Sequence, residues 1–212
     1  VKQILEFSRQ TETERIPVSL TPLVKEAVKM LREIMPATIE IRLHLRTGAD
    51  TILADATQIY QILMNLCTNA YQALREKGGT LQIRLEERFL DQGEAKALNL
   101  EAGDYVQLSV TDDGPGISPS IIDKIFDPFF STKDKTEGTG LGLATSYSIA
   151  KKHGGHIDLE SDPGVGSTFR VCLPAAAETA VAEGVRPAAA RRGEGRVLVM
   201  DDEHPVREIA RE

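Results

Sequence analysis

The amino-acid sequence predicts a two-layer α/β (α+β) sandwich, in which helices cover one face of a mixed β-sheet. Segments with apolar residues at helical spacing alternate along the chain with segments in which every second residue is apolar. The two kinds of segment are interspersed, which is typical of helices packed on a sheet. A hydrophobic fraction of 41% and a charged fraction of 27% are those of an ordinary globular protein, so a sizeable core can form.

Capping residues and glycines mark the predicted helices. Thr21-Pro22 supplies a capping residue and a proline at the first helical position. Asp55 caps the most regular helix, in which apolar residues recur at helical spacing until Gly78-Gly79 ends it. Helices are therefore expected at about 22–35, 56–77, 118–126 and 140–153.

Period-two alternation predicts the strands. The clearest runs from Ile39 to Leu45, where apolar residues alternate with charged or polar ones. A polar loop is expected between the second and third strands, and residues 127–137 have no periodicity and are expected to form a loop. The expected strands are 38–46, 81–90, 105–110, 156–160 and 167–173, with a short extended piece at 18–20.

The composition divides the 212-residue chain into four parts. Residues 1–14 read as the end of a helix, and residues 15–174 carry the predicted sandwich. Residues 175–195 are rich in Ala, Glu, Arg, Gly and Pro without apolar periodicity, as in a linker. Residues 196–212 open with an apolar run that predicts the beginning of a further strand.

Charge and cysteine content limit the classes of function. A net charge of −7 argues against a nucleic-acid-binding surface, so no nucleic-acid partner is expected. A bound polyanion would have to be held locally, by backbone amides, a metal ion or a few lysines. Cys67 and Cys172 lie far apart and are interpreted as buried thiols. No run approaches the roughly 18 apolar residues that a membrane-spanning helix needs.

Two asparagines on the helix capped by Asp55 form the first candidate site. Asn65 and Asn69 are four residues apart and therefore share a helix face, beside the apolar stripe. An Asn amide competes with the backbone inside a helix, so two stacked amides suggest oxygen ligands for a hard cation such as Mg²⁺. A pair of ordinary half-exposed amides is the alternative.

Three glycine-containing segments supply the remaining candidates. In Asp112-Asp-Gly114-Pro-Gly116-Ile117 the glycines let the backbone approach a ligand, and a carboxylate can accept a hydrogen bond from an exocyclic amine. The same string also makes an ordinary turn. Gly138-Thr139-Gly140-Leu141-Gly142-Leu143 leads into a helix, whose free N–H groups could cradle phosphates. Gly164-Val-Gly166-Ser-Thr168-Phe169 enters the last strand. The dinucleotide fingerprint matches poorly, and no Walker loop is present.

These segments, in this order and with Asp127-Pro-Phe-Phe-Ser-Thr-Lys133 between the second and third, resemble the ATP-binding catalytic domain of sensor histidine kinases, in the Bergerat ATPase superfamily. The resemblance covers residues 55–173, more than half of the chain. It implies the Bergerat fold, in which ATP and Mg²⁺ are held between sheet and helices under a mobile lid. The implied function is transfer of the ATP γ-phosphoryl group to a protein histidine, for two-component phosphorelay signalling.

The resemblance implies a role for each matching residue. Asn69 would bind Mg²⁺ with Asn65 assisting, and Asp112 would accept a hydrogen bond from the adenine amino group. Lys133 is implied to reach the phosphates from the lid, which makes Asn65 and Lys133 the implied catalytic residues. The lid anchors would be Phe126, Phe129 and Phe130. The other implied ATP-binding residues are Gly114, Gly116 and Ile117 near the base, Gly138, Thr139, Gly140, Leu141, Gly142 and Leu143 near the phosphates, and Thr168 beside the adenine.

One position separates classes within the superfamily. Heat-shock chaperones, type II topoisomerases and mismatch-repair ATPases have a Glu one turn before the Mg²⁺-binding Asn, where it acts as the base for water. Here that position is Asn65, and an amide cannot accept the proton, which disfavours hydrolysis. Phosphoryl transfer is favoured, through positioning and charge neutralisation. A hydrolytic ATPase and a module that binds nucleotide without transferring phosphate are the alternatives.

The phosphoacceptor of this family lies on a helical hairpin that precedes the catalytic domain, and residues 1–14 resemble the end of such a hairpin. The histidines of the chain lack the family's acceptor setting: His44, His153, His156 and His204. The acceptor is therefore expected upstream of residue 1. His153 and His156 follow a helix, and helix-end and turn chemistry explains them better than metal binding.

The last segment and the partners follow from the same resemblance. Residues 196–212, with Asp201 and Asp202, resemble the start of a response-regulator receiver domain, too short to fold alone. The expected partners are ATP, the protein's own hairpin, a tethered or separate receiver domain, and a second copy of the full-length protein in a homodimer. The chain is expected to be the cytoplasmic portion of a protein that is cytoplasmic or attached to the inner membrane.

Overall fold

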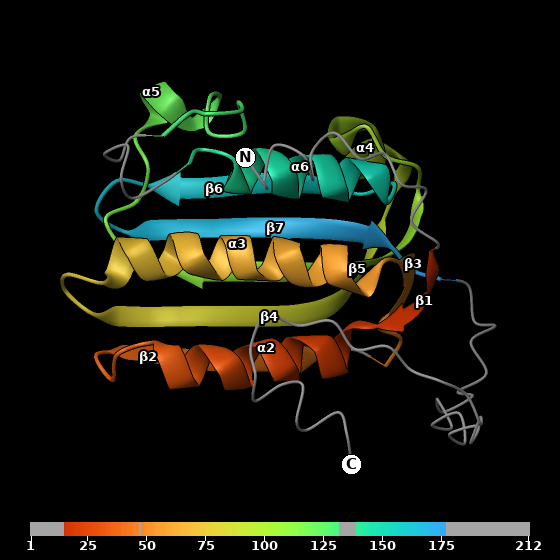
Figure 1. Cartoon of the computed structure of the whole chain (residues 1–212). Helices are drawn as coiled ribbons and strands as arrows, with labels where there is room; N and C mark the ends of the chain where they lie inside the picture. The colour runs from red at the N-terminus through yellow and green to blue at the C-terminus, as the bar shows by residue number, and fades with distance from the viewer. Residues whose placement is uncertain (1–14, 47, 132–138, 177–212) are drawn as a thin grey trace, which may run out of the picture. The chain divides into compact units, whose positions relative to one another are not determined.

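The computed structural model describes residues 15–46, 48–131 and 139–176, whose helices and strands are shown in Figure 1. The main sheet has five strands and four neighbouring pairs: β2 runs parallel to β4, and the other three pairs are antiparallel. The predicted mixed sheet is therefore confirmed. Its strands, in spatial order, are β2 (Ile39–Arg46), β4 (Gly79–Leu90), β5 (Gly103–Asp112), β7 (Gly166–Pro174) and β6 (His156–Asp162).

Three helices lie side by side on one face of this sheet, as Figure 1 shows: α2 (Leu20–Ile34), α3 (Ala56–Leu74) and α6 (Gly142–Lys152). α3 contacts both α2 and α6. Every second residue of the central strands points toward these helices and joins one hydrophobic core, for example Val106, Leu108 and Val110 of β5. The predicted two-layer arrangement is confirmed.

α3 is the helix that the sequence marked most clearly. The Asp55 carboxylate accepts hydrogen bonds from the backbone N–H groups of Thr57 at 2.8 Å and Gln58 at 3.4 Å, which is the predicted N-cap. Full burial of one Leu or Ile side chain contributes about 1.5–3 kcal/mol to stability. The buried residues of α3 therefore fix the rotation of the helix about its axis. The buried residues are Ile59, Ile62, Leu63, Leu66, Cys67, Ala70 and Leu74.

The predicted start of α2 is wrong by two residues. The helix begins at Leu20, so that Thr21 and Pro22 lie inside its first turn. The cap comes from a distant residue: the Asp50 carboxylate accepts a hydrogen bond from the Thr21 backbone N–H at 2.6 Å and from the Ser19 hydroxyl at 2.9 Å. A cap supplied across the fold cannot be recognised from local sequence.

The predicted polar loop between β4 and β5 contains a helix, α4 (Gln92–Leu98). It begins with a capping box, in which the Asp91 carboxylate accepts from the Glu94 backbone N–H at 2.8 Å and Glu94 accepts from the Asp91 N–H at 3.4 Å. α4 packs Ala95 against Tyr105 and Cys172 in a second, smaller apolar cluster. The helix therefore covers one end of the sheet face that α2, α3 and α6 leave open.

A second, two-stranded sheet was not predicted. β1 (Ile16–Ser19) pairs antiparallel with β3 (Thr51–Ala54). Ala175 forms a bridge to Ile52, so the folded chain continues past the predicted domain end at 174. α5 (Pro119–Ile122) is shorter than the predicted 118–126.

The predictions for residues 1–14 and 196–212 lie outside the described residues, as does nearly all of the predicted 175–195 linker. Among the described helices, none has the length and apolarity needed to cross a membrane.

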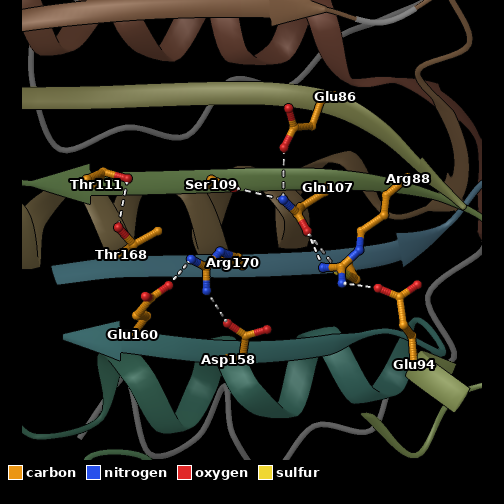
Figure 2. A network of polar contacts seen from close by, with 11 residues as sticks. Glu86, Arg88, Glu94, Gln107, Ser109, Thr111, Asp158, Glu160, Thr168 and Arg170 are labelled. Atoms are coloured by element: carbon orange, nitrogen blue, oxygen red, sulfur yellow. Dashed lines mark hydrogen bonds and ion pairs between the residues drawn. The ribbon is translucent and has the colours of Figure 1, made fainter. Parts of the chain in front are cut away.

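The open face of the sheet carries several groups of polar contacts, shown in Figure 2 and called the polar layer below. Gln107 and Ser109 are buried there, although no helix lies over them, because longer side chains lean across. Arg88 donates to Gln107 Oε1 at 2.7 Å, and Gln107 Nε2 donates to Glu86 at 3.0 Å. Arg170 pairs with Asp158 at 3.3 Å and also with Glu160. These bonds satisfy the polar groups of the central strands.

Both cysteines are buried free thiols, as predicted. Burial raises the pKa of Cys67 to about 12, so this thiol is uncharged and unreactive at neutral pH. Burial also raises the pKa of Cys172.

Candidate functional site

A cavity of about 700 Å³ opens between α3, the loop that follows β5, and the N-terminal end of α6. Its walls are contributed by five parts of the chain that are far apart in sequence. The floor is formed by the ends of β5 and β7, with Asp112, Ser167 and Phe169. The apolar side is formed around α5, with Ile117, Ile121 and Ile125.

α3 presents a polar stripe to this cavity. Asn65 and Asn69 both line it, so the two amides lie on one accessible face of the helix. The same stripe includes Thr68 and Gln72, at spacings of three and four residues, and it continues to Glu76 in the turn that follows the helix. Asn65 Nδ2 donates to the carbonyl oxygen of Gly142 at 2.9 Å and to Ser146 Oγ at 3.2 Å, whereas no described residue hydrogen-bonds the Asn69 side chain.

Asp112 places a carboxylate at the other end of the cavity, where only 5% of the residue is exposed. Burial raises the pKa of this carboxyl group above its ordinary value, and the nearby Asp113 acts in the same direction. Hydrogen bonds from the backbone N–H groups of Gly114, at 3.0 Å, and Ser167 oppose that shift. The arrangement is a desolvated hydrogen-bond acceptor held in one orientation.

The loop after Asp112 is tied to the β6–β7 hairpin. The Gly164 N–H donates to the Pro115 carbonyl oxygen at 2.8 Å, and the Ile117 N–H donates to Ser161 Oγ at 2.8 Å. Gly116 has φ +70°, and a Cβ there would lie 2.1 Å from the Asp162 carbonyl oxygen. Only glycine fits this position without strain.

The third glycine segment closes the cavity at the start of α6. Gly140 has φ +67°, and a Cβ there would lie 2.5 Å from the backbone of Phe129, whose N–H donates to the Gly140 carbonyl oxygen at 3.0 Å. α6 then begins at Gly142 without a side-chain cap. Its first N–H groups are therefore available to a ligand in the cavity.

Most of the residues predicted from the sequence meet in this one cavity. Those that line it are Asn65, Asn69, Asp112, Gly116, Ile117, Phe130, Thr139, Gly140, Gly142 and Leu143. Gly114 and Leu141 lie next to the lining, as the N–H donor to Asp112 and the residue before α6. Lys133 and Gly138 lie outside the described residues.

The predicted aromatic anchors differ from one another. Phe130 lines the cavity, while Phe126 packs on Tyr147 of α6 with ring centroids 5.5 Å apart. Phe129 has φ +67° and is 70% exposed. Phe126 and Phe130 therefore pack against the core, whereas Phe129 does not.

The prediction for Thr168 is corrected. Its hydroxyl lies 3.1 Å from that of Thr111, in the polar layer on the open face of the sheet (Figure 2). The preceding residue, Ser167, lines the cavity and is buried beside Asp112. Side chains alternate between the two faces of a strand, so Ser167 and not Thr168 faces the cavity.

Sequence reasoning also missed residues that it could have found. Thr68, Gln72 and Glu76 follow from continuing the helical spacing of the two asparagines along α3. Ser167 and Phe169 follow from the apolar alternation of β7, which continues through Val171. Ile121 and Ile125 had no local signal, because only the fold brings α5 to the cavity.

The charge of the described lining is negative. Glu76 and Asp112 are its ionisable residues, and no lysine, arginine or histidine belongs to the lining within the part of the chain that the structure describes. No cluster of three His, Cys, Asp or Glu residues that could hold a metal occurs there either. A metal bound in this cavity would rely on amide oxygens and on oxygens of the ligand itself.

His153 has a structural role, as predicted. Its Nδ1–H donates to the Ile149 carbonyl oxygen at 2.8 Å, and Nε2 accepts from the Asp55 backbone N–H at 3.2 Å. Burial lowers the pKa of His153, which keeps the ring neutral for this pair of bonds. The histidine thus joins the end of α6 to the start of α3.

Comparison with known proteins shows the family to which the chain belongs. Residues 54–177 match the family described as histidine kinase-, DNA gyrase B-, and HSP90-like ATPase, and the chain belongs to this family. Sensor kinase CckA of Brucella abortus is 34% identical over 98% of this chain and 23% of its own length. Sensor protein FixL of Bradyrhizobium diazoefficiens is 35% identical over 84% of this chain and 33% of its own length. The chain therefore spans about a quarter to a third of these relatives.

Solved structures agree with this assignment. The catalytic domain of histidine kinase ThkA is 30% identical, with a TM-score of 0.63, over 77% of this chain and 97% of that domain. Full-length ShkA in complex with AMPPNP is 26% identical, with a TM-score of 0.65, over 82% of this chain and 35% of that chain. ThkA in complex with response regulator TrrA is 29% identical, with a TM-score of 0.64, over 82% of this chain and 46% of that chain. The folded part of the chain is the catalytic domain of the sensor histidine kinase class.

Two glycine substitutions should differ in their effect on stability. Gly116→Ala forces a side chain into φ +70° and against the Asp162 carbonyl, and we expect a loss of about 2 kcal/mol or more. Gly142→Ala places its Cβ 3.7 Å from Asn65 in ordinary contact, and stability should stay within about 0.5 kcal/mol or rise. Thermal unfolding followed by circular dichroism measures both, and equal melting temperatures would contradict the geometry of the loop.

Asp112 should make stability depend on pH. Because burial raises its pKa in the folded state, its contribution to stability is present below the unfolded carboxyl pKa of about 4 and is lost as pH rises through the folded pKa. Asp112→Asn keeps an oxygen acceptor without the charge. We expect the variant to melt above the wild type at pH 7, with a difference that shrinks toward pH 4. A difference that is constant between these pH values would argue against a penalised buried charge.

Proposed function

We propose that this cavity binds ATP together with Mg²⁺ and that the domain passes the γ-phosphoryl group to a histidine of a protein. The observation that carries the proposal is the polarity of the cavity: a buried carboxylate at one end, and paired amides with an open helix N-terminus at the other. A nucleoside triphosphate has the matching sequence of groups, a base with donor edges and a chain of phosphates.

The proposal assigns the base to the end near Asp112. Its carboxylate would accept a hydrogen bond from the 6-amino group of adenine, and its burial strengthens that bond. Ser167 lies beside it, and Ile117 and Phe169 provide apolar walls for the ring. Gly114 and Gly116 would let the chain pass close to the base.

The phosphates are assigned to the end near Asn65 and Asn69. The donor set there fits a magnesium ion, since amide oxygens are hard ligands and the described lining has no cationic side chain to neutralise a triphosphate. A bound Mg²⁺ would supply that charge neutralisation. The N–H groups that open α6, between Gly140 and Leu143, would hold phosphate oxygens, and Thr139 lies within reach. From the sequence alone we add Lys133 and Gly138.

The hydrogen bonding of Asn65 favours phosphoryl transfer over ATP hydrolysis. Its amide is a donor to Gly142 and Ser146, so it cannot act as a general base for water. In this proposal the domain positions the nucleotide and does not activate a water molecule. The acceptor of the phosphoryl group is a histidine supplied by another segment.

The rest of the protein is proposed on the sequence and its relatives. We propose a phosphoacceptor hairpin before residue 15, a receiver domain beginning near residue 196, and a homodimer formed through the hairpin. A related structure supports the response-regulator part of this setting, since ThkA was solved in complex with response regulator protein TrrA. The described domain would then be the cytoplasmic portion of a protein that is cytoplasmic or attached to the inner membrane.

Replacement of the proposed metal ligand should separate the metal from the nucleotide. We expect Asn69→Ala to retain the fold and to lower the affinity for a non-hydrolysable ATP analogue with Mg²⁺ by at least about tenfold. Affinity measured in EDTA should not change, because the amide is assigned to the metal. Isothermal titration calorimetry measures both, with the exposed Thr57→Ala as a control variant on the same helix. An unchanged affinity with Mg²⁺ would contradict the assignment.

Phosphoryl transfer should appear when an acceptor is supplied. We expect a phosphoacceptor hairpin from a sensor-kinase relative, fused before Arg15, to become labelled by γ-³²P-ATP with a bond that is stable to base and labile to acid. The control fusion has Gln in place of the acceptor histidine and should remain unlabelled. Nucleotide binding without label would favour the alternative of a binding module, and rapid phosphate release without label would favour a hydrolytic ATPase.

A further inference from the structure

The side chain of Asn65 lines the cavity and also links α3 to α6. Its Nδ2 is 2.9 Å from the carbonyl oxygen of Gly142 and 3.2 Å from Oγ of Ser146, both on α6. Ser146 Oγ in turn donates to the same Gly142 carbonyl oxygen at 2.9 Å. Ser146 is completely buried, whereas Asn65 and Gly142 line the cavity.

The donors and acceptors in this triangle can be assigned by chemistry. A carbonyl oxygen only accepts, so the amide atom facing Gly142 is the NH₂ group of Asn65. The single hydroxyl hydrogen of Ser146 is given to the same carbonyl, so Ser146 can only accept from Asn65. Both contacts are made only in this orientation of the amide. A flipped Asn65 would set its oxygen against the Gly142 carbonyl oxygen, and the Ser146 hydroxyl could donate to the flipped amide only by giving up its own bond to that carbonyl.

This orientation has a consequence for the cavity. With both partners of Nδ2 on α6, the oxygen Oδ1 is the group of Asn65 left for a ligand, and no described residue donates a hydrogen bond to it. The terminal torsion of Asn is otherwise broad, so an amide with one partner samples several angles. Two hydrogen-bond partners on the same helix hold the amide of Asn65 at a single angle.

We propose that Ser146 is a positioning residue, which holds the Asn65 amide with its oxygen directed to the magnesium ion of a bound nucleotide. This inference rests on the proposed function. Ser146 touches neither nucleotide nor metal in this arrangement, since it is fully buried and does not belong to the cavity lining. It acts through Asn65 and through the first carbonyl of α6. Groups that orient metal ligands in this way typically change metal affinity 10- to 100-fold when removed.

The test is a double-mutant cycle on the 212-residue chain, with Ser146→Ala, Asn65→Ala and the double variant. The measurement is the affinity for a non-hydrolysable ATP analogue as a function of Mg²⁺ concentration, and again in EDTA. We expect Ser146→Ala to weaken the apparent Mg²⁺ affinity by about tenfold. The affinity in EDTA and the melting temperature should remain close to those of the wild type. In the Asn65→Ala background, Ser146→Ala should have no further effect.

Ser148→Ala is the matched control, since this serine lies on the same helix and is exposed. It should titrate with Mg²⁺ like the wild type. Equal losses with and without Mg²⁺ would show that Ser146 only supports the packing of α6, and additive effects of the two substitutions would show that it does not act through Asn65. Either result overturns the inference, as does an unchanged Mg²⁺ affinity in Ser146→Ala. Failure of the wild-type chain to bind the analogue with Mg²⁺ would instead overturn the proposed function, and this inference with it.

Discussion

The rotation of α3 about its own axis is the constraint on which the site depends. Seven residues of this helix are buried in the core, and each one resists rotation because it would leave a cavity or expose apolar surface. The adjacent polar residues, from Asn65 through Asn69 to Glu76, are then directed into the cavity. The apolar core therefore sets the direction of the polar groups, although none of these seven residues lines the cavity.

The two loops that complete the cavity are held by different means. The loop after β5 is fastened to the β6–β7 hairpin through backbone hydrogen bonds of Pro115 and Ile117. The start of α6 is fastened to α3 through Asn65. Both ends of the cavity are therefore organised before a ligand arrives, which lowers the entropy that binding would cost. The buried Asp112 has the opposite effect on the free energy of folding. Its charge lowers the stability of the domain and is nevertheless retained at the site.

The sequence-based analysis succeeded where the governing forces are local and failed where a distant group intervenes. The helical spacing of α3 and its Asp55 cap are local, and both were predicted. The start of α2 was wrong because Asp50, about 30 residues away, caps it. α4 was not predicted, although Asp91 and Glu94 form a capping box with a spacing that is typical of a helix start. Here the polar composition of the segment concealed a usable local signal.

For the candidate site, the sequence by itself determined which residue types are present: two amides one helical turn apart, a carboxylate at a strand end, and glycines where the backbone takes positive φ. Tertiary structure alone decided which of them meet. It placed Ser167 rather than Thr168 beside Asp112, because strand register chooses the face on which a side chain lies. It also placed Ser146 behind Asn65, because packing of α6 on α3 joins residues that are about 80 positions apart.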